Sequence, residues 1–296
     1  MTLHVITGRG ATAARTALLL AAGGERVRIV SRTGGGPDHP LVEKVAADAT
    51  DTDRLTELLT GAVTLINCAA PAYDRWPQDF PPLAASLLAA VRRTGARYVM
   101  LGNLYGYGPV DGPLHPGLPL KAAGPKGRVR AAVWEQAAAA GVPVTEVRAG
   151  QFYGAGAVSV FTLMVVRPVL AGAPALVPQE VDLPHSYSSI GDTARTLVAA
   201  ARDERAFGRA WHAPVVTPSL RELAGRLAGL AGAPAPRIEQ LSGREVALLA
   251  LTAPFWGELH ETLFMPGVPQ LSDHSETEAV LGVGATPVDQ VLAEML

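Results

Sequence analysis

Cysteine and long apolar runs are scarce in this sequence, and each shortage excludes a class of protein. Cys68 is the only cysteine among 296 residues, so no internal disulfide can form and a reducing compartment is expected. The longest apolar runs, such as Ala17–Ala22 and Val246–Ala253, are far too short to cross a bilayer. The first predicted strand starts almost at Met1, so we expect no signal peptide and a cytoplasmic location.

Charge and metal-ligand patterns are missing as well. The net charge is −2 and no basic block occurs, so neither nucleic acid nor an acidic membrane is an expected partner. The seven histidines are scattered without His-x-x-x-His spacing, so we expect no metal site. The nucleophile-elbow pattern Gly-x-Ser-x-Gly is absent, which argues against a hydrolase. A small molecule remains as the expected partner, and the abundance of Ala, Gly and Pro suggests a bacterial coding sequence.

Short β-rich runs alternate with Ala-rich helical runs through the first half of the chain. This alternation predicts a parallel sheet covered by helices on both faces. The predicted strands are Leu3–Thr7, Val27–Ser31, Val45–Ala47, Val63–Asn67, Tyr98–Leu101 and Val144–Arg148. The predicted helices are Thr12–Ala22, Thr52–Leu59, Leu83–Thr94 and Ala122–Ala140.

The alternation weakens after Arg148. A glycine-containing loop is expected at Ala149–Gly156, and the later segments read mainly as helices. They are Val158–Leu170, Ser189–Arg202, Ser219–Ala231, Arg244–Leu251, Glu276–Leu281 and a C-terminal helix with Thr286 as its N-cap and Pro287 as its first residue. We therefore predict a dinucleotide-binding domain over residues 1–150 and a smaller, mainly helical substrate lobe over 151–296, with some later segments returning to the first domain.

The turn after the first predicted strand carries the strongest functional signal. Gly8, Gly10 and Ala13 fit the pattern Gly-x-Gly-x-x-Ala between a buried strand and a helix. Small residues let the backbone approach a pyrophosphate, and the helix N-terminus behind them favours negative charge. The segment predicts a doubly wound sheet of the Rossmann type that binds a dinucleotide, with cofactor contacts from Thr7, Gly8, Gly10, Ala11 and Thr12. The alternative is a purely structural turn in which the small residues serve helix–sheet packing.

The end of the second predicted strand indicates which dinucleotide. An acidic residue there would bind the ribose hydroxyl of NAD, but this chain has Ser31 and Arg32. A hydroxyl and a cation suit a 2′-phosphate, so we expect NADP(H) to be preferred over NAD(H).

Five segments in the correct order resemble the extended short-chain dehydrogenase/reductase superfamily, more narrowly its atypical NAD-dependent epimerase/dehydratase-like members. The resemblance covers nearly the whole chain. The segments are Thr7–Ala14 with Ser31-Arg32, Asp48–Asp51, Asn67–Pro71, Tyr98–Pro109, and Asp273–Gly282 followed by Thr286-Pro287. The resemblance implies that Asp48 and Ala49 lie against the adenine and that Cys68, Ala69 and Ala70 line the cofactor.

The departures from this family concern its catalytic residues. The family uses a Ser or Thr after the fifth strand and a Tyr-x-x-x-Lys pair on the next helix. Here Asn103 takes the Ser position, Lys126 the Tyr position and Arg130 the Lys position. No tyrosine occurs between Tyr107 and Tyr153, so a small alignment shift cannot restore the pair.

Several side chains could supply the missing proton. Tyr105 and Tyr107 lie on the loop expected beside the nicotinamide, with Asn103 to orient a substrate oxygen, and Lys126 could act if its pKa fell. Alternatively, Tyr107 packs between the lobes and Lys126 is a solvated lysine. Arg130 could bind a ribose hydroxyl or phosphate, but it cannot act as an acid or base near neutral pH.

Tyr107, Tyr153 and His185 are the expected substrate contacts. Tyr153 follows the sixth predicted strand, where an aromatic wall is expected, and a histidine can transfer protons near neutral pH.

Three kinds of function fit the sequence. The first is an NADP(H)-dependent oxidoreductase acting on a small organic or secondary-metabolite carbonyl or enone. The second is a non-redox or internally redox epimerase, dehydratase or cyclase in the same pocket. The third is a non-catalytic sensor that binds the dinucleotide, because a sensor would also lack the catalytic pair. The resemblance implies a possible homodimer through the helix that contains Arg130.

Overall fold

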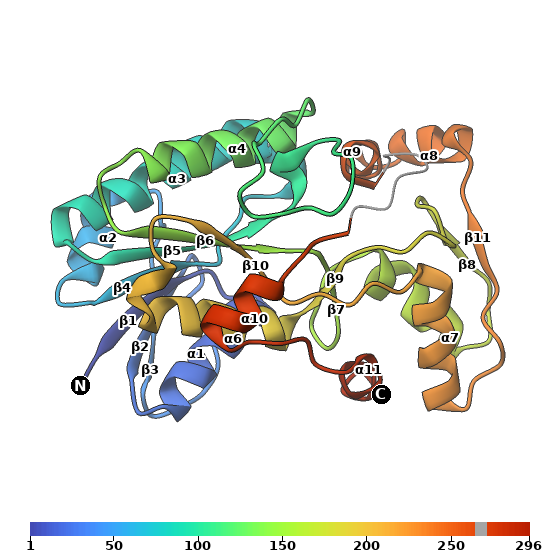
Figure 1. The fold of residues 1–296 in the computed structure, drawn as a ribbon, viewed down its shortest axis with the longest axis horizontal. Helices are drawn as coiled ribbons and strands as arrows, with labels where there is room; N and C mark the ends of the chain where they lie inside the picture. Colours follow the sequence, from blue (N-terminus) through green and yellow to red (C-terminus); the bar gives the residue numbers. More distant parts are fainter. Residues whose placement is uncertain (264–270) are drawn as a thin grey trace.

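A single parallel sheet of seven strands organises the chain (Figure 1). The computed structural model describes residues 1–263 and 271–296. The strand order is β10-β6-β5-β4-β1-β2-β3, so the order reverses between β1 and β4, where ligands bind in doubly wound sheets. The strands are β1 (Leu3–Thr7), β2 (Arg26–Ser31), β3 (Val42–Ala46), β4 (Thr64–Asn67), β5 (Arg97–Asn103), β6 (Val144–Ala149) and β10 (Ala210–His212).

Helices cover both faces of this sheet, as the alternating sequence predicted. Figure 1 shows α1 and α6 on one face and α2, α3 and α4 on the other. The central strands β4 and β6 are buried at every residue, because apolar helices cover them from both sides. The helices are α1 (Ala11–Ala22), α2 (Thr52–Leu59), α3 (Trp76–Thr94), α4 (Pro125–Ala138) and α6 (Ile190–Arg202).

Helix α3 begins seven residues before the predicted start at Leu83. Pro77 sits in its first turn, where no backbone N–H is needed within the helix. Trp76, Phe80 and Leu83 form a buried face that stabilises the extra turns although two further prolines interrupt the hydrogen bonding. Tertiary burial therefore outweighs the proline signal here.

The second half forms a smaller lobe with its own apolar core. Its elements are β7 (Gln151–Tyr153), the π-helical turn η3 (Phe161–Val165), α5 (Val166–Leu170), β8 (Ala175–Val177), β9 (Tyr187–Ser189), α7 (Leu220–Ala231), β11 (Ile238–Gln240), α8 (Gly243–Ala250) and α9 (Pro254–Leu263). The terminal α11 (Val288–Ala293) packs on α7, and α10 (Ser275–Leu281) returns to α6 and β10. Part of the second half thus belongs to the sheet domain.

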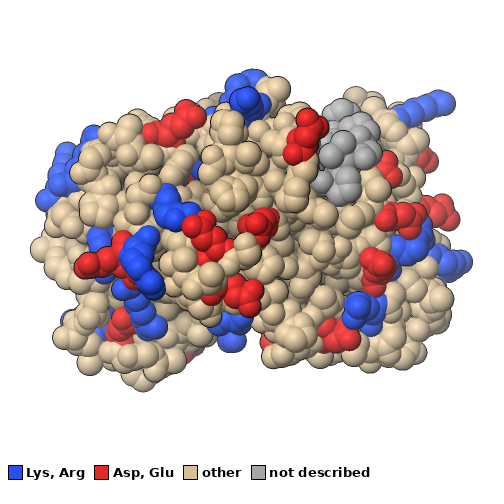
Figure 2. Space-filling view, in the orientation of Figure 1, with Lys and Arg blue, Asp and Glu red and all other residues tan. Residues whose placement is uncertain are grey.

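Charged side chains of one sign do not gather on the face of the molecule drawn in Figure 2. On the face drawn in Figure 2, basic and acidic side chains are interspersed among uncharged ones. Within residues 1–263 and 271–296, no helix combines the length and the apolar character that crossing a bilayer requires. The same residues contain no cluster of three or more potential metal ligands.

Candidate active site

The turn after β1 passes very close to the end of β4. Gly8 has φ = 101°, and its N–H donates a 2.9 Å hydrogen bond to the carbonyl of Val30. A Cβ at this position would lie 2.9 Å from the backbone N of Ala69. Only glycine combines that conformation with that approach.

The N-terminus of α1 lies open next to this turn. Gly10 is the N-cap residue, no side chain caps the helix, and no acidic residue stands in its first turn. A Cβ built on Gly10 would meet nothing within 4 Å. Ala11 and Thr12 then form the first helical turn, with Thr12 buried. Free backbone N–H groups, the positive end of the helix dipole and open space fit a pyrophosphate.

Side-chain hydrogen bonds join the ends of β1 and β4 beside this turn. The Asn67 Oδ1 accepts hydrogen bonds from the Thr7 hydroxyl at 2.7 Å and from the Ala69 N–H at 3.0 Å. Cys68 is half-buried, and desolvation raises the pKa of its thiol to about 12, so it stays a neutral thiol. Ala70 is exposed. These residues lie where the strand order reverses between β1 and β4. The cofactor contacts assigned to them stay a prediction.

Ser31 and Asp48 use their polar atoms locally. The Ser31 Oγ accepts a 3.1 Å hydrogen bond from the Gly35 N–H and lies 3.3 Å from the Gly35 carbonyl. Arg32 is exposed. The Asp48 carboxylate accepts hydrogen bonds from the N–H and hydroxyl of Thr50, which lower its pKa, and Ala49 beside it is half-buried. The serine hydroxyl expected to bind a 2′-phosphate is therefore already bonded within its own loop.

A cavity of about 570 Å³ lies beyond the carboxyl ends of β5 and β6. Its wall comes from both halves of the chain, including the ends of these strands, β7 and α9. The chain has only four tryptophans, and two of them, Trp76 and Trp256, line this cavity. None of its described lining residues is Lys, Arg, Asp or Glu. The space therefore suits an uncharged and largely apolar molecule.

Asn103 and Tyr105, two of the predicted catalytic residues, line this cavity together. The Asn103 Oδ1 accepts a 3.2 Å hydrogen bond from the Tyr105 N–H, which directs the amide nitrogen of Asn103 elsewhere. The Tyr105 hydroxyl accepts a 3.3 Å hydrogen bond from the hydroxyl of Tyr73, another lining residue. A pair of phenols thus meets at the wall of the cavity.

Lys126 lies behind this pair and is buried. Its Nζ forms an ion pair with Glu258 on α9 and lies 4.7 Å from the centre of the Tyr73 ring. A cation that is paired with a carboxylate and placed over an aromatic face is stabilised in its charged form. The position therefore suits a fixed positive charge beside the phenols.

Arg130 faces the sheet. Its guanidinium donates hydrogen bonds to Glu146 at 2.8 Å and to the Leu101 carbonyl at 3.0 Å, and it stacks on Phe80. Glu146 also accepts a 2.7 Å hydrogen bond from Arg148, so one buried carboxylate lies between two buried guanidinium groups. The ribose or phosphate contact predicted for Arg130 stays a prediction, and its observed hydrogen-bond partners belong to the sheet.

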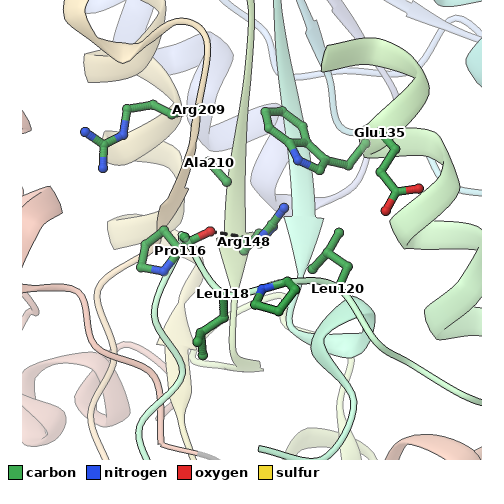
Figure 3. A pocket seen from close by; sticks show the side chains of 10 residues that line it. Pro116, Leu118, Leu120, Glu135, Arg148, Arg209 and Ala210 are labelled. Carbon is green, nitrogen blue, oxygen red and sulfur yellow. Dashed lines mark hydrogen bonds between the residues drawn. The ribbon is translucent and has the colours of Figure 1, made fainter. Parts of the chain in front are cut away.

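Tyr107 continues this buried network. Its hydroxyl accepts a 2.7 Å hydrogen bond from Arg148 and lies 2.6 Å from His212 Nε2. Tyr107 is fully buried and is not a lining residue of the 570 Å³ cavity. Figure 3 shows side chains that line a second, smaller cavity, where Arg148 donates a hydrogen bond to the Pro116 carbonyl. The volume of this cavity is about 330 Å³. No predicted catalytic residue lines this smaller cavity.

The predicted substrate contacts separate into two groups. His185 lines the larger cavity, and burial lowers its pKa, which favours the neutral imidazole. Tyr153 lies in the core of the smaller lobe against Tyr187, with ring centres 6.2 Å apart. Sequence reasoning missed Tyr73, Gln151, Gln179 and Glu258, because only the fold brings them to this cavity or to Lys126.

Several solved structures resemble the whole chain, although no protein-family model and no curated protein matches its sequence. MoeE5, solved with UDP-glucuronic acid and NAD, has a TM-score of 0.79 at 19% identity, covering 98% of this chain and 96% of that one. A Bacillus cereus UDP-glucuronic acid 4-epimerase with NAD has a TM-score of 0.79 at 16% identity, with coverages of 99% and 97%. A Bacillus anthracis dTDP-glucose 4,6-dehydratase with NAD has a TM-score of 0.77 at 15% identity, with coverages of 99% and 95%.

These structures contradict the expectation of NADP(H), because all three hold NAD. The physical reason for the error lies in Ser31, whose hydroxyl bonds to Gly35 within its own loop. The likeness extends over both lobes and confirms the predicted fold class. The chain therefore has the fold shared by these NAD-bound structures, among them an epimerase and a dehydratase.

Proposed function

We propose that this chain is an NAD(H)-dependent oxidoreductase that acts on a small, uncharged organic carbonyl compound. The observation that carries this proposal is the hydroxyl of Tyr105 at the wall of the larger cavity, beside Asn103. Both residues lie at or just beyond the carboxyl end of β5, near the switch point of the sheet. The NAD found in the similar structures, together with the open N-terminus of α1, supports the choice of cofactor.

The chain's own residues would bind the cofactor and donate the proton to the substrate. The backbone N–H groups in the first turn of α1 would hold the pyrophosphate, and the absence of side chains at Gly8 and Gly10 would leave room for it. NAD(H), when bound there, supplies or accepts a hydride. The Asn103 amide nitrogen would hold the substrate oxygen, and the Tyr105 hydroxyl would give that oxygen its proton during reduction.

The Tyr73 hydroxyl and Lys126 would then support Tyr105. The Tyr73 hydroxyl already donates to the Tyr105 oxygen, and this hydrogen bond strengthens when Tyr105 becomes a phenolate. Lys126 supplies positive charge over the Tyr73 ring while Glu258 keeps it in place. In this proposal Lys126 is a positioning residue, and Tyr105 takes the part that the missing family tyrosine would play.

A second candidate is an epimerase or dehydratase in which the hydride returns to the same substrate. The likeness to an epimerase and a dehydratase favours this possibility. The two functions differ in whether NADH is consumed in proportion to product.

A cofactor titration followed by turnover assays tests the proposal. NADH and NAD+ are titrated while nicotinamide and tryptophan fluorescence are recorded, and saturable binding of both is expected. NADH oxidation is then followed with uncharged ketones and enones. Consumption of one NADH per product supports the oxidoreductase, whereas product formation without net oxidation supports the second candidate. Absence of saturable binding by either dinucleotide would overturn both.

A further inference from the structure

Two buried polar atoms in the wall of the larger cavity have no hydrogen-bond partner. They are Gln151 Oε1 and His185 Nε2, and both residues line the cavity. Leaving a buried acceptor unpaired is unfavourable, so such atoms mark a place where a ligand can supply the partner. Gln151 stands on β7, directly after the carboxyl end of β6.

A chain of hydrogen bonds holds the Gln151 side chain. Its Nε2 donates to Gln179 Oε1 at 3.1 Å, and the Gln179 Nε2 donates to the Tyr187 hydroxyl at 3.5 Å. Gln179 and Tyr187 are almost completely buried. Because the amide nitrogen of Gln151 is engaged, the amide oxygen remains as a fixed acceptor. A fixed acceptor selects a ligand that donates.

The rest of the wall limits the ligand's charge and surface. Apolar side chains dominate the lining, among them Leu163, Met164 and Leu259. The described lining offers no cation that could balance a phosphate or carboxylate. Transferring an unpaired anion into such surroundings is very costly.

We propose that this cavity binds an uncharged, largely apolar compound carrying a hydroxyl group, and that Gln151 Oε1 accepts the hydrogen bond from that hydroxyl. The inference rests on the proposed function in one respect, namely that the cavity is the substrate site. It predicts rejection of nucleoside-diphosphate sugars, which MoeE5 binds as UDP-glucuronic acid. The hydroxyl is a recognition group and is distinct from the carbonyl that reacts at Tyr105.

Calorimetric titration with a matched pair of probes tests the inference. The probes are 4-propylphenol and 4-propylanisole, which differ because the ether cannot donate a hydrogen bond. We expect the phenol to bind about tenfold more tightly, since one satisfied buried acceptor contributes about 1.4 kcal/mol. UDP-glucose should neither bind nor displace the phenol. Equal affinity for the two probes, no binding of the phenol, or displacement by UDP-glucose would each overturn the inference.

Substitution of Gln151 tests whether its side chain causes the preference for the phenol over the ether. Gln151→Met keeps the side-chain length but removes the acceptor, so the phenol and the ether should then bind within about twofold of each other. The exposed Gln136→Met on α4 is the matched control and should keep the full preference. A Gln151→Met protein that retains the tenfold preference would assign the acceptor elsewhere and contradict the proposal. Should that variant fail to fold, the probe pair on the native chain still decides.

A parallel NADH titration separates this inference from the proposed function. Phenol-selective binding without any NADH binding would remove the oxidoreductase and leave the hydroxyl site standing. NADH binding without phenol selectivity would overturn the hydroxyl site and leave the proposed oxidoreductase standing.

Discussion

Arg130 and Glu146 form a buried ion pair, with a guanidinium nitrogen 2.8 Å from a carboxylate oxygen. Arg130 stands where the resemblance to short-chain dehydrogenases places a lysine. In this structure its contacts are the carboxylate, the Leu101 carbonyl and the Phe80 ring. The charge at this helix position therefore connects α4 to the central sheet.

Arg130→Met should destabilise the protein without lowering its affinity for NADH. Removing one partner of a buried ion pair costs about 3–5 kcal/mol, and the lower end applies because Arg148 still pairs with Glu146. Chemical denaturation would show this loss, and an NADH titration at low denaturant should give an unchanged affinity. A variant with native stability and much weaker NADH binding would instead support a ribose contact.

Tyr105→Phe should lower turnover by about 10²- to 10⁴-fold and leave NADH affinity unchanged, because it removes only the proton donor. Tyr107→Phe is the matched control, since Tyr107 contacts Arg148 and His212 and does not line the larger cavity. It should cost about 1–3 kcal/mol in unfolding free energy and little in kcat. The opposite pattern in steady-state kinetics would move the acid to Tyr107.

His212 should make the protein less stable below pH 6.5. Burial lowers its pKa from 6.5 to about 4, and its Nε2 faces the Tyr107 hydroxyl. Between those pH values the unfolded chain binds the proton that the folded chain excludes. Stability is therefore full above pH 6.5 and falls as the pH drops toward 4, by about 3 kcal/mol in total. His212→Gln should flatten this part of the pH dependence in denaturation curves, and an identical slope in both proteins would refute the assignment.

Gly10→Ala should separate cofactor binding from folding. A Cβ at Gly10 meets no protein atom within 4 Å, but it would occupy the space next to the N-terminus of α1. We expect near-native stability and at least a tenfold loss of NADH affinity by fluorescence titration. Gly225→Ala within α7 is the matched control, because it also adds a methyl group in open space but lies far from Gly10 in the sequence. Gly141→Ala would not serve, because Gly141 has φ = 71° and alanine would be strained there. Equal NADH affinities in the Gly10 and Gly225 variants would exclude the pyrophosphate site.

The sheet was predictable because its signals are local. Strands such as Leu3–Thr7 and helices such as Thr52–Leu59 follow from buried apolar runs and periodicity, and the structure confirms both bounds. Strand β10 was missed because three residues carry no periodic signal and gain their role only by pairing with β6. The predicted start of α3 at Leu83 was also wrong, because burial of Trp76 and Phe80 stabilises the earlier turns of the helix.

The site was less predictable than the fold. Asn103 and Tyr105 could be placed from the end of a strand, since the carboxyl edge of a parallel sheet is where sites form. The partners of Lys126 and Tyr105 lie far from them in sequence, at Glu258 and Tyr73. The cofactor preference failed because residue types alone do not reveal that Ser31 bonds to Gly35.

Strand β10 has a consequence for the order in which the chain folds during synthesis. It pairs with β6, yet about 60 residues separate the two strands, and β7, α5, β8, β9 and α6 lie between them. Until His212 has left the ribosome, β6 is the outermost strand and its backbone groups on that side have no strand partner. Such an edge can pair with another nascent chain. Rapid pairing of Ala210–His212 with β6, before α7 and the later elements of the smaller lobe are synthesised, would therefore protect the growing chain from aggregation.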